Sequence, residues 1–357
     1  MSCEKKLRIG IIGTGGISHV HMRGYQAQKD RVELVACCDL DEDKVKAYAE
    51  SYGFQRWYTD LHEMMEKEEL DCVSVCTWNA AHKEATIAAL KGGANVICEK
   101  PMAMNAKEAQ EMIDVANETG KLLQIGFVRR FGDDAKTVVN LKKAGLLGEI
   151  YYAKASYLRR DGCPGGWFAD KAYSGGGPLI DLGVHVIDLA RYLSGGPKPV
   201  RVFGVTYDHI GSDRAANAET DWVRSGSKSR FEKNVEDMAA AMICFDNGLT
   251  IQLETSFNLN CQGNTTNVQV FGTKGGASLN GNVEFYTAQA GMYVNSKAQG
   301  DTSFKFNEAF IAEIKGFLDA AEGKAPCIAP KEDGLAVMRI LDAVYESART
   351  GKMVEID

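Results

Sequence analysis

Long apolar runs, paired cysteines and clustered histidines are all missing from this sequence of 357 residues. No run reaches the length of about 20 apolar residues that a membrane-spanning helix needs. The chain starts with polar residues and leads into a glycine turn without a cleavage region, so we expect no signal peptide. There is no Cys-x-x-Cys motif, and the 6 histidines form no evident ligand set, so we expect no metal. The protein is therefore predicted to be cytoplasmic, with no membrane partner.

An excess of basic charge is missing as well. The formal net charge is −7, which argues against nucleic acid as a partner, because nucleic-acid binding relies on clustered Lys and Arg. The 10 cysteines are scattered and many stand inside apolar runs, so we predict that they are reduced and buried. Hydrophobic residues make up 45 % of the chain and charged residues 25 %, as in globular proteins, and the length predicts two domains.

Residues 1–126 alternate short apolar runs with helical patterns. Strands that read as continuous apolar runs are typical of a parallel sheet covered by helices on both faces. The sequence therefore predicts a doubly wound α/β domain of the Rossmann type at 1–126. The expected strands are 7–13, 32–39, 72–77, 94–98 and 122–127.

The pattern changes from residue 127 onward, where longer strands follow one another with few helices between them. Asp246-Asn247-Gly248 predicts a tight hairpin turn between two of them. We therefore predict an α+β domain on an antiparallel sheet at 127–357, with a loop at 211–234. The pattern does not decide which domain the two last helices pack on. The expected strands are 149–157, 200–208, 235–245, 250–257 and 267–272, and the last helices are 307–322 and 332–350.

A glycine-rich turn follows the first strand and opens the first helix. Gly13, Gly15 and Ser18 match the G-x-G-x-x-G/A fingerprint of dinucleotide-binding loops, except that Ser stands at the third position. Glycines there allow a tight turn and the close approach of a pyrophosphate to the helix N-terminus. The residues of this loop expected to face the cofactor are Gly13, Thr14, Gly15, Gly16 and Ile17.

Asp39 ends the second strand, where a carboxylate can accept hydrogen bonds from the ribose hydroxyls of adenosine. The same carboxylate would repel a 2′-phosphate, and no Lys or Arg follows before Lys44. The sequence therefore favours NAD over NADP. An Asp that caps the following helix is compatible with both roles.

Lys100 follows a later strand of the same sheet, within Cys98-Glu99-Lys100-Pro101. Ligands of open α/β sheets bind beyond the carboxyl ends of the strands, so Lys100 is expected to reach the cofactor site. A lysine partly removed from water beside a cationic ring can exchange a proton near neutrality. The alternative is an ordinary solvated lysine at a strand end.

Residues 175–189 break the backbone with three glycines and a proline and then predict an apolar helix that carries Asp181 and His185. Side chains at i and i+4 share a helix face, so the carboxylate and the imidazole can converge. An ionisable pair on an apolar face is costly unless it is partnered or used. Capping or simple pairing within the helix is the alternative.

These motifs together resemble the Gfo/Idh/MocA oxidoreductases, the family of glucose–fructose oxidoreductase and inositol dehydrogenase. The resemblance spans nearly the whole chain, and its most specific parts are Glu99-Lys100-Pro101 and Asp181-x-Gly-x-His185 in this order and separation. Further matches are Cys76-Thr-Trp-Asn79-Ala-Ala-His82, Gly126-Phe-Val-Arg-Arg130-Phe and Gly272-Thr-Lys-Gly275.

The resemblance implies a nicotinamide enzyme acting on sugars, cyclitols or their derivatives, with a large open antiparallel sheet in the second domain. It also implies a cis proline at Pro101 and a homodimer or homotetramer formed through that sheet. Lys100, Asp181 and His185 fall on catalytic positions, and Arg130 falls where inositol-dehydrogenase-like members touch substrate. Further cofactor-facing positions are Asp39, Thr77, Trp78, Asn79, His82, Glu99 and Lys100, and Tyr157, Trp167, Asp181 and His185 are substrate-binding candidates.

The chain departs from the family pattern in two places. Trp78 stands where proline is common, and the stretch from Tyr157 to Trp167 is rich in Arg and Gly. Arg159 and Arg160 fit a solvated strand edge as well as a substrate contact, and Trp167 fits packing as well as sugar stacking.

The predicted reaction is reversible oxidation of a ring secondary alcohol, with Lys100 preferred over His185 as the acid/base and Asp181 supporting the pair. An elimination with internal NAD recycling, or a non-catalytic NAD- or sugar-responsive regulator, are the alternatives.

Overall fold

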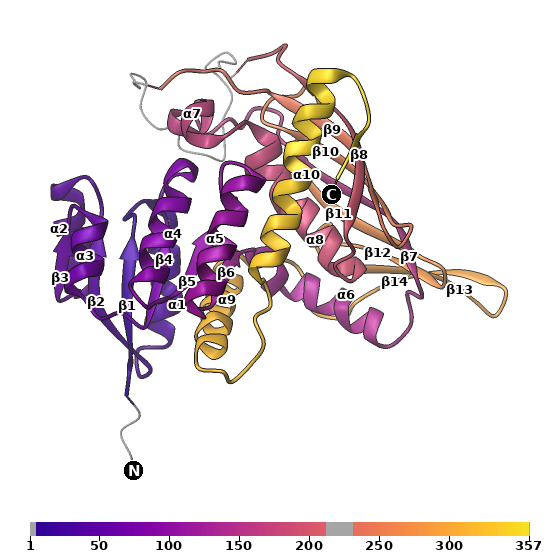
Figure 1. The fold of residues 1–357 in the computed structure, drawn as a ribbon. Coiled ribbons are helices and arrows are strands. Elements are labelled where there is room, and N and C mark those ends of the chain that lie inside the picture. Colours follow the sequence, from indigo (N-terminus) through magenta and orange to yellow (C-terminus); the bar gives the residue numbers. More distant parts are fainter. Residues whose placement is uncertain (1–4, 212–230, 357) are drawn as a thin grey trace. The chain divides into compact units, whose positions relative to one another are not determined.

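The computed structural model describes residues 5–211 and 231–356 (Figure 1). The chain divides into two compact units, Met1–Phe131 with Phe306–Leu335, and Gly132–Lys305 with Ala336–Asp357. The boundary therefore falls after residue 131 rather than 126, and a late segment returns to the first unit. Most of the predicted loop 211–234 lies outside the described residues.

The first unit is built on a six-stranded parallel sheet with the strand order β3-β2-β1-β4-β5-β6. This order is that of the doubly wound dinucleotide-binding fold, so the predicted fold of the first domain is confirmed. The short strand β3 was not predicted, since two of its three residues are exposed. The strands are β1 (Leu7–Ile12), β2 (Val32–Cys38), β3 (Arg56–Tyr58), β4 (Cys72–Val75), β5 (Asn95–Glu99) and β6 (Leu123–Gly126).

Helices cover both faces of this sheet, and α9 (Phe306–Ala321) is one of them. Ile314 of α9 lies in the same apolar core as Ile9 and Met22, and a Cβ added at Gly24 of α1 would meet its side chain. The sequence pattern did not decide on which domain this helix packs. In the structure, α9 belongs to the first unit. The other helices are α1 (Gly16–Ala27), α2 (Glu42–Tyr52), α3 (Leu61–Lys67), α4 (His82–Lys91) and α5 (Ala106–Thr119).

The second unit contains a nine-stranded sheet with the order β14-β13-β12-β11-β7-β10-β9-β8-β15. The pairing is antiparallel except between β7 and β10, which run parallel. The predicted antiparallel sheet is therefore confirmed as mostly antiparallel. This one pair is parallel because a long connection through α8 (Val184–Ser194) separates the two strands and no hairpin joins them. The predicted turn at 246–248 does join β9 to β10, with Gly248 at φ +86°.

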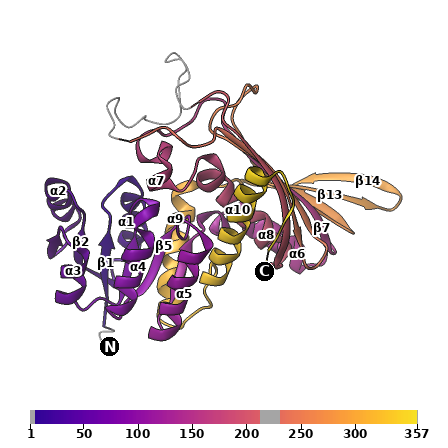
Figure 2. The same cartoon turned by 45° about the horizontal axis from the view of Figure 1, so that its top comes forward.

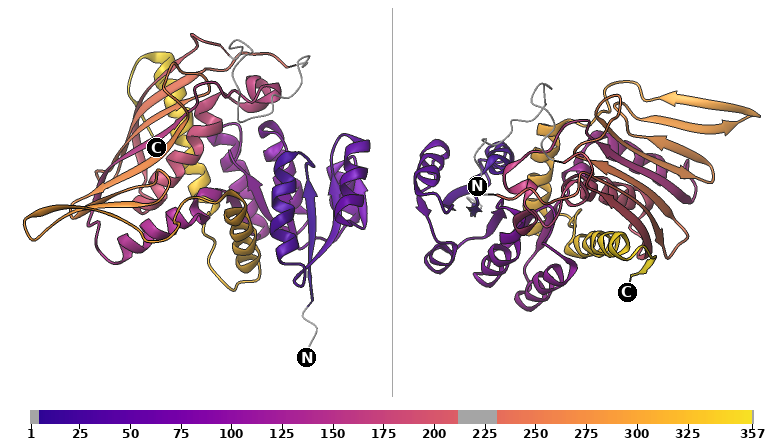
Figure 3. Two further views of the ribbon diagram at one scale, coloured as in Figure 1. Left: turned by 180° about the vertical axis from the view of Figure 1, so that it is seen from behind. Right: turned by 90° about the horizontal axis from the view of Figure 1, so that it is seen from above.

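Helices lie along one face of this second sheet, as the right-hand view of Figure 3 shows, and β13 and β14 extend as a hairpin beyond the other strands in Figure 2. Val344 of α10 (Lys331–Thr350) contacts β8 where a Cβ on Gly204 would not fit. The strands are β7 (Ile150–Leu158), β8 (Pro199–Tyr207), β9 (Met238–Phe245), β10 (Thr250–Ser256), β11 (Thr265–Gly272), β12 (Gly275–Ser278), β13 (Glu284–Gln289), β14 (Met292–Lys297) and β15 (Val354–Glu355).

Nine cysteines are described, and all of them are free. Burial raises the pKa of the Cys37 and Cys98 thiols to about 12, which leaves them as neutral, inert side chains. The prediction of reduced, buried cysteines is confirmed for those within the strands of the first unit.

Over the described residues, none of the helices combines the length and apolar character that a bilayer-spanning segment requires.

Candidate active site

The glycine turn after β1 approaches β4 too closely for a side chain. Gly13 has φ +90°, and a Cβ there would lie 2.6 Å from the carbonyl oxygen of Cys76. Its N–H donates to the carbonyl of Cys38 at the end of β2. Gly13 therefore ties the ends of three neighbouring strands together, which is the tight-turn role expected for the first glycine of the fingerprint.

Gly15 and Gly16, in contrast, have open space where a Cβ would stand, and neither has a positive φ. Gly15 is the N-cap of α1, yet no side chain caps this helix and its first turn carries no acidic residue. The protein itself gives no reason for glycine here, whereas a phosphate at an uncapped helix N-terminus requires close backbone approach. The loop therefore fits the pyrophosphate of a dinucleotide. Ile17 lies half-buried in the same first turn.

Ser18 does not disturb the loop. Its side chain is fully buried, and its hydroxyl donates to the carbonyl of Gly15 at 2.6 Å. The unusual third residue of the fingerprint thus stabilises the turn that the glycines form.

Asp39 lies at the end of β2 and is held by the same loop. Its Oδ2 accepts from the N–H and hydroxyl of Thr14 at 2.7 and 2.8 Å, and from Lys44 Nζ at 2.8 Å. Burial raises the pKa of Asp39, but these hydrogen bonds outweigh burial and the pKa is lowered. The carboxylate is therefore ionised and hydrogen-bonded to the glycine turn. Lys44, which lies five residues after Asp39 in the sequence, forms an ion pair with it.

The residues after β4 form a second loop at this edge of the sheet. Thr77 and Trp78 are half-buried and Asn79 is buried. His82, at the start of α4, is 1 % exposed, and its ring contacts two carbonyl oxygens, of Pro101 at 2.7 Å and of Thr77 at 3.2 Å. Burial lowers the pKa of His82, so the ring is neutral. Its observed contacts are to the backbone of two loops, and a contact with cofactor stays a prediction.

Glu99 and Lys100 stand at the carboxyl end of β5. Glu99 is buried; its Oε1 lies 2.9 Å from His21 Nε2, and its Oε2 accepts the N–H of Lys100 at 3.1 Å. Lys100 is half-buried, and the peptide bond between Lys100 and Pro101 is cis, as predicted. The glycine turn, Asp39, the loop after β4 and Lys100 thus gather at the carboxyl ends of neighbouring strands, where open α/β sheets bind ligands.

Arg130 is buried and held by contacts within the first unit. Its side chain is 1 % exposed, and it donates to Asp333 and to the carbonyl of Ile328, both at 2.7 Å. The guanidinium also lies 5.2 Å from the ring centre of Phe127. These contacts hold the buried guanidinium within the first unit, and its contact with substrate stays a prediction.

Asp181 and His185 lie in the second unit, on a helix whose first turn is π-helical (η4, Leu179–Gly183) before α8 begins. The N–H of Val184 reaches back five residues to the carbonyl of Leu179. The predicted helix is present, but the α-helical first turn is not. Just before this turn, Thr255 of β10 donates to the carbonyl of Pro178 at 2.8 Å. Asp181 is buried and His185 half-buried.

Glu236 stabilises the start of this helix and was missed by sequence reasoning. Its carboxylate accepts the N–H groups of Gly177 at 3.0 Å and Leu179 at 3.2 Å, and the hydroxyl of Tyr345 at 3.0 Å. The residue is partly exposed, but its carboxylate points inward, and burial raises its pKa although the three donors oppose this. Nothing in the sequence links a glutamate before β9 to a helix more than fifty residues earlier.

The remaining substrate candidates lie near the end of β7. Tyr157 is half-buried, and the guanidinium of Arg159 lies 5.3 Å from its ring centre. Arg159 is 3 % exposed and donates to the carbonyl of Gly162, so the solvated-edge interpretation is wrong for it, whereas Arg160 is exposed. Trp167 stacks on Phe168 with ring centres 3.8 Å apart and is half-buried.

Two family sequence models match this chain. "Oxidoreductase family, NAD-binding Rossmann fold" matches residues 7–127, and "Oxidoreductase family, C-terminal alpha/beta domain" matches residues 142–356. The chain therefore belongs to the Gfo/Idh/MocA oxidoreductase family.

Individual relatives match the chain from end to end. The D-glucoside 3-dehydrogenase of Escherichia coli K12 is 36 % identical over 356 residues, which cover 98 % of this chain and 97 % of the relative. The myo-inositol 2-dehydrogenase of Thermotoga maritima is 25 % identical over 359 residues, with 98 % and 99 % covered. Among solved structures, levoglucosan dehydrogenase in complex with NADH and levoglucosan has the same fold, with a TM-score of 0.84, 23 % identity, and 99 % and 100 % covered.

Proposed function

We propose that this protein is an NAD-dependent dehydrogenase that oxidises a ring secondary alcohol of a sugar, glycoside or cyclitol. The observation that carries the proposal is the gathering of an uncapped glycine loop, Asp39 and Lys100 at one edge of the first sheet. The relatives named for glucoside, inositol and levoglucosan oxidation support the substrate class.

The chemistry divides between cofactor and protein. NAD, when bound, supplies the hydride acceptor. Lys100 takes the proton of the substrate hydroxyl, and His185 holds the developing alkoxide by a charge-assisted hydrogen bond. Asp181 orients His185 and supports its charge. What supports these roles is the match of all three residues to the catalytic positions of the family motifs.

NAD is proposed as the preferred nicotinamide. Asp39 is ionised, and a carboxylate at this position disfavours a 2′-phosphate. Lys44 lies beside Asp39 and offsets part of this repulsion, so we expect weak but measurable activity with NADP.

The test is a turnover screen of the purified protein with NAD and with NADP against glucosides, free sugars, inositols, levoglucosan and sugar acids. We expect reduction of NAD with at least one ring polyol. A higher kcat/KM with NADP would contradict the interpretation of Asp39. Product formed without net NADH would point to elimination with internal recycling, and binding of NAD and sugar without any product would point to a regulator.

The partner proposed for assembly is a second copy of this chain. Phe203 and Met242 lie opposite each other on β8 and β9 and are 44 % and 41 % exposed, which supports a docking role for this sheet. Sedimentation of the wild-type and the Phe203→Glu variant tests it: a dimer or tetramer that dissociates in the variant is expected, and a monomeric wild-type would contradict the proposal.

A further inference from the structure

Two histidines of the first unit are almost completely buried and have no part in the proton transfer proposed above. His21 lies on α1 and is 0 % exposed, and His82 begins α4 and is 1 % exposed. Each contacts a group adjacent to Lys100 in the chain, one on each side. A buried imidazole that lost its hydrogen bond would leave a polar group unsatisfied in the interior, which costs free energy. Such an imidazole therefore restricts the movement of the group that it contacts.

His21 acts on the N-terminal side of Lys100, through Glu99. One oxygen of the Glu99 carboxylate lies 2.9 Å from His21 Nε2, and the other accepts the N–H of Lys100 at 3.1 Å. Rotation of the carboxylate would therefore break both contacts at once. The imidazole and the Lys100 backbone are linked by this one side chain.

The donor on His21 can be assigned from the groups behind it. Burial raises the pKa of Tyr25 well above its usual value, so its hydroxyl stays protonated; it lies 2.7 Å from Ser74 Oγ. Ser74 Oγ in turn lies 3.1 Å from His21 Nδ1. If Tyr25 donates to Ser74 and Ser74 donates to Nδ1, the imidazole carries its proton on Nε2 and donates it to Glu99. Every hydrogen bond of this series is then satisfied in one direction.

His82 acts on the C-terminal side of Lys100. Its Nδ1 lies 2.7 Å from the carbonyl oxygen of Pro101, and its Nε2 lies 3.2 Å from that of Thr77. A neutral imidazole has a single N–H, and the lowered pKa of His82 keeps the ring neutral. The shorter contact assigns the proton to Nδ1, so His82 donates to Pro101. The two histidines thus use opposite ring nitrogens.

We propose that His21 and His82 are positioning residues that hold the backbone on both sides of Lys100 and so fix the place of its amine. The catalytic part of this inference rests on the proposed function, whereas the hold on the backbone does not. A reacting group that is misplaced by about 1 Å can lose about 100-fold in rate, which gives such a pair a clear kinetic consequence.

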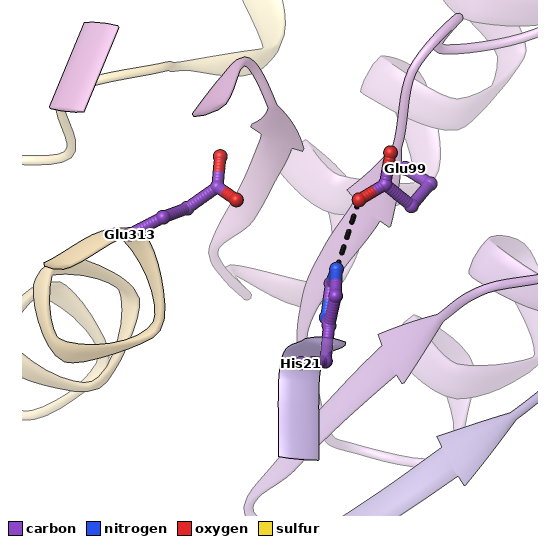
Figure 4. A group of neighbouring side chains, drawn as sticks. All are labelled: His21, Glu99 and Glu313. Carbon is purple, nitrogen blue, oxygen red and sulfur yellow. Dashed lines mark hydrogen bonds and ion pairs between the residues drawn. The ribbon is translucent and has the colours of Figure 1, made fainter. Parts of the chain in front are cut away.

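Glu313 of α9 completes the surroundings of His21. Its carboxylate points toward His21 and Glu99 in Figure 4, and the ligand atoms of the three residues lie within 4.8 Å of one another. One imidazole and two carboxylates are also a ligand set for a divalent cation. However, Nε2 of His21 and Oε1 of Glu99 are at direct hydrogen-bond distance, shorter than the about 3.4 Å between ligands of one tetrahedral ion. The geometry favours donation to Glu99 over metal ligation.

The opposite ring nitrogens allow a crossed rescue experiment. The amide nitrogen of Gln occupies roughly the position of Nε2, and that of Asn roughly the position of Nδ1. We therefore expect His21→Gln and His82→Asn to keep most of the activity. His21→Asn and His82→Gln should lower kcat by about 10-fold to 100-fold with KM for the polyol nearly unchanged. His62→Asn, at an exposed histidine of α3, is the control and should behave as wild-type.

Hydrogen exchange of the peptide spanning residues 98–104 separates this inference from the proposed function. Faster exchange in His21→Asn and His82→Gln, but not in their rescue partners, is expected whether or not a substrate has been found. Unchanged exchange in all four variants would overturn the positioning role, as would equal kcat for Asn and Gln at each site. A stoichiometric bound cation in the purified wild-type would also overturn it.

Discussion

Each unit holds its candidate catalytic residues with an inward-pointing glutamate, but the two glutamates work differently. Glu99 links a buried imidazole to the backbone of Lys100, its neighbour in the chain. Glu236 accepts hydrogen bonds from two backbone N–H groups and from the hydroxyl of Tyr345, at the start of the helix that carries Asp181. The first arrangement is built on a parallel sheet edge and links the end of β5 to α1. The second is assembled from three separate segments.

This difference decides what each half tolerates. At the first sheet edge the glycine loop leaves open space around Gly15. Before η4, in contrast, other groups occupy the space beside the glycines. A Cβ on Gly176 would collide with the hydroxyl of Tyr345, and a Cβ on Gly177 would collide with the backbone of Glu236. We therefore expect the first half to lose function without losing stability, and the second to lose both together.

Removal of the Lys100 amine should have the largest effect. Lys100→Ala is expected to lower kcat by about 100-fold to 10,000-fold, which is the contribution of a general acid or base, with no change in thermal midpoint. Lys91→Ala, at an exposed lysine that ends α4, is the matched control. Steady-state kinetics with the best polyol of the screen measures the effect. Equal turnover by Lys100→Ala and wild-type would remove Lys100 from the mechanism.

The glycine comparison comes next. Gly177→Ala should destabilise the second unit by about 1–3 kcal/mol, because backbone must shift to admit the methyl group. Gly15→Ala should leave the thermal midpoint unchanged but weaken NAD binding, and Gly263→Ala, also in open space, should change neither. Calorimetry and NAD titration report the two properties. Unaltered NAD affinity in Gly15→Ala would contradict the pyrophosphate assignment.

A smaller loss is expected from the hydroxyl that holds Glu236. Tyr345→Phe removes one hydrogen bond to a buried carboxylate and should cost about 1–3 kcal/mol of unfolding free energy. Tyr286→Phe removes a hydrogen bond of similar length to the partly exposed Glu284 and should cost less. If chemical denaturation finds the two variants equally stable, the inward-pointing carboxylate does not hold η4 as described.

The pH dependence of His82 should be the weakest effect. Its pKa is lowered in the folded protein, so the unfolded chain binds a proton that the folded chain does not, over a window that opens below the ordinary histidine value of about 6.5. The stability contributed by the neutral ring is complete above that value and decreases as the pH falls. The loss on acidification from neutral pH should therefore be smaller in His82→Asn. A steeper loss of stability with acidification in His82→Asn than in wild-type would contradict the lowered pKa of His82.

The same contrast explains how far the sequence could lead. The strands of the first unit were predictable because buried parallel strands read as apolar runs, and their order places Asp39 and Lys100 at one edge without any long-range information. The three residues of β3 and the exposed hairpin of β13 and β14 carry no such signal. The parallel pairing of β7 with β10 depends on a long connection that periodicity does not describe.

Long-range side-chain partners were beyond sequence reasoning. Arg130 matches a family motif, but its ion pair with Asp333 is formed by a segment two hundred residues later. Asp181 and His185 were found because they lie four residues apart. The side-chain contacts at the start of their helix come from Thr255 and Glu236, which lie elsewhere in the fold.

Transfer of deuterium tests the central claim most directly. A polyol from the screen, labelled at the carbon that is oxidised, is incubated with the wild-type protein and NAD, and the NADH is isolated for mass spectrometry. We predict one deuterium in each NADH for each ketone formed, and at least about 100-fold less labelled NADH with Lys100→Ala over the same time. Ketone without label in NADH, or product without any accumulated NADH, would contradict net hydride transfer from a ring alcohol to NAD.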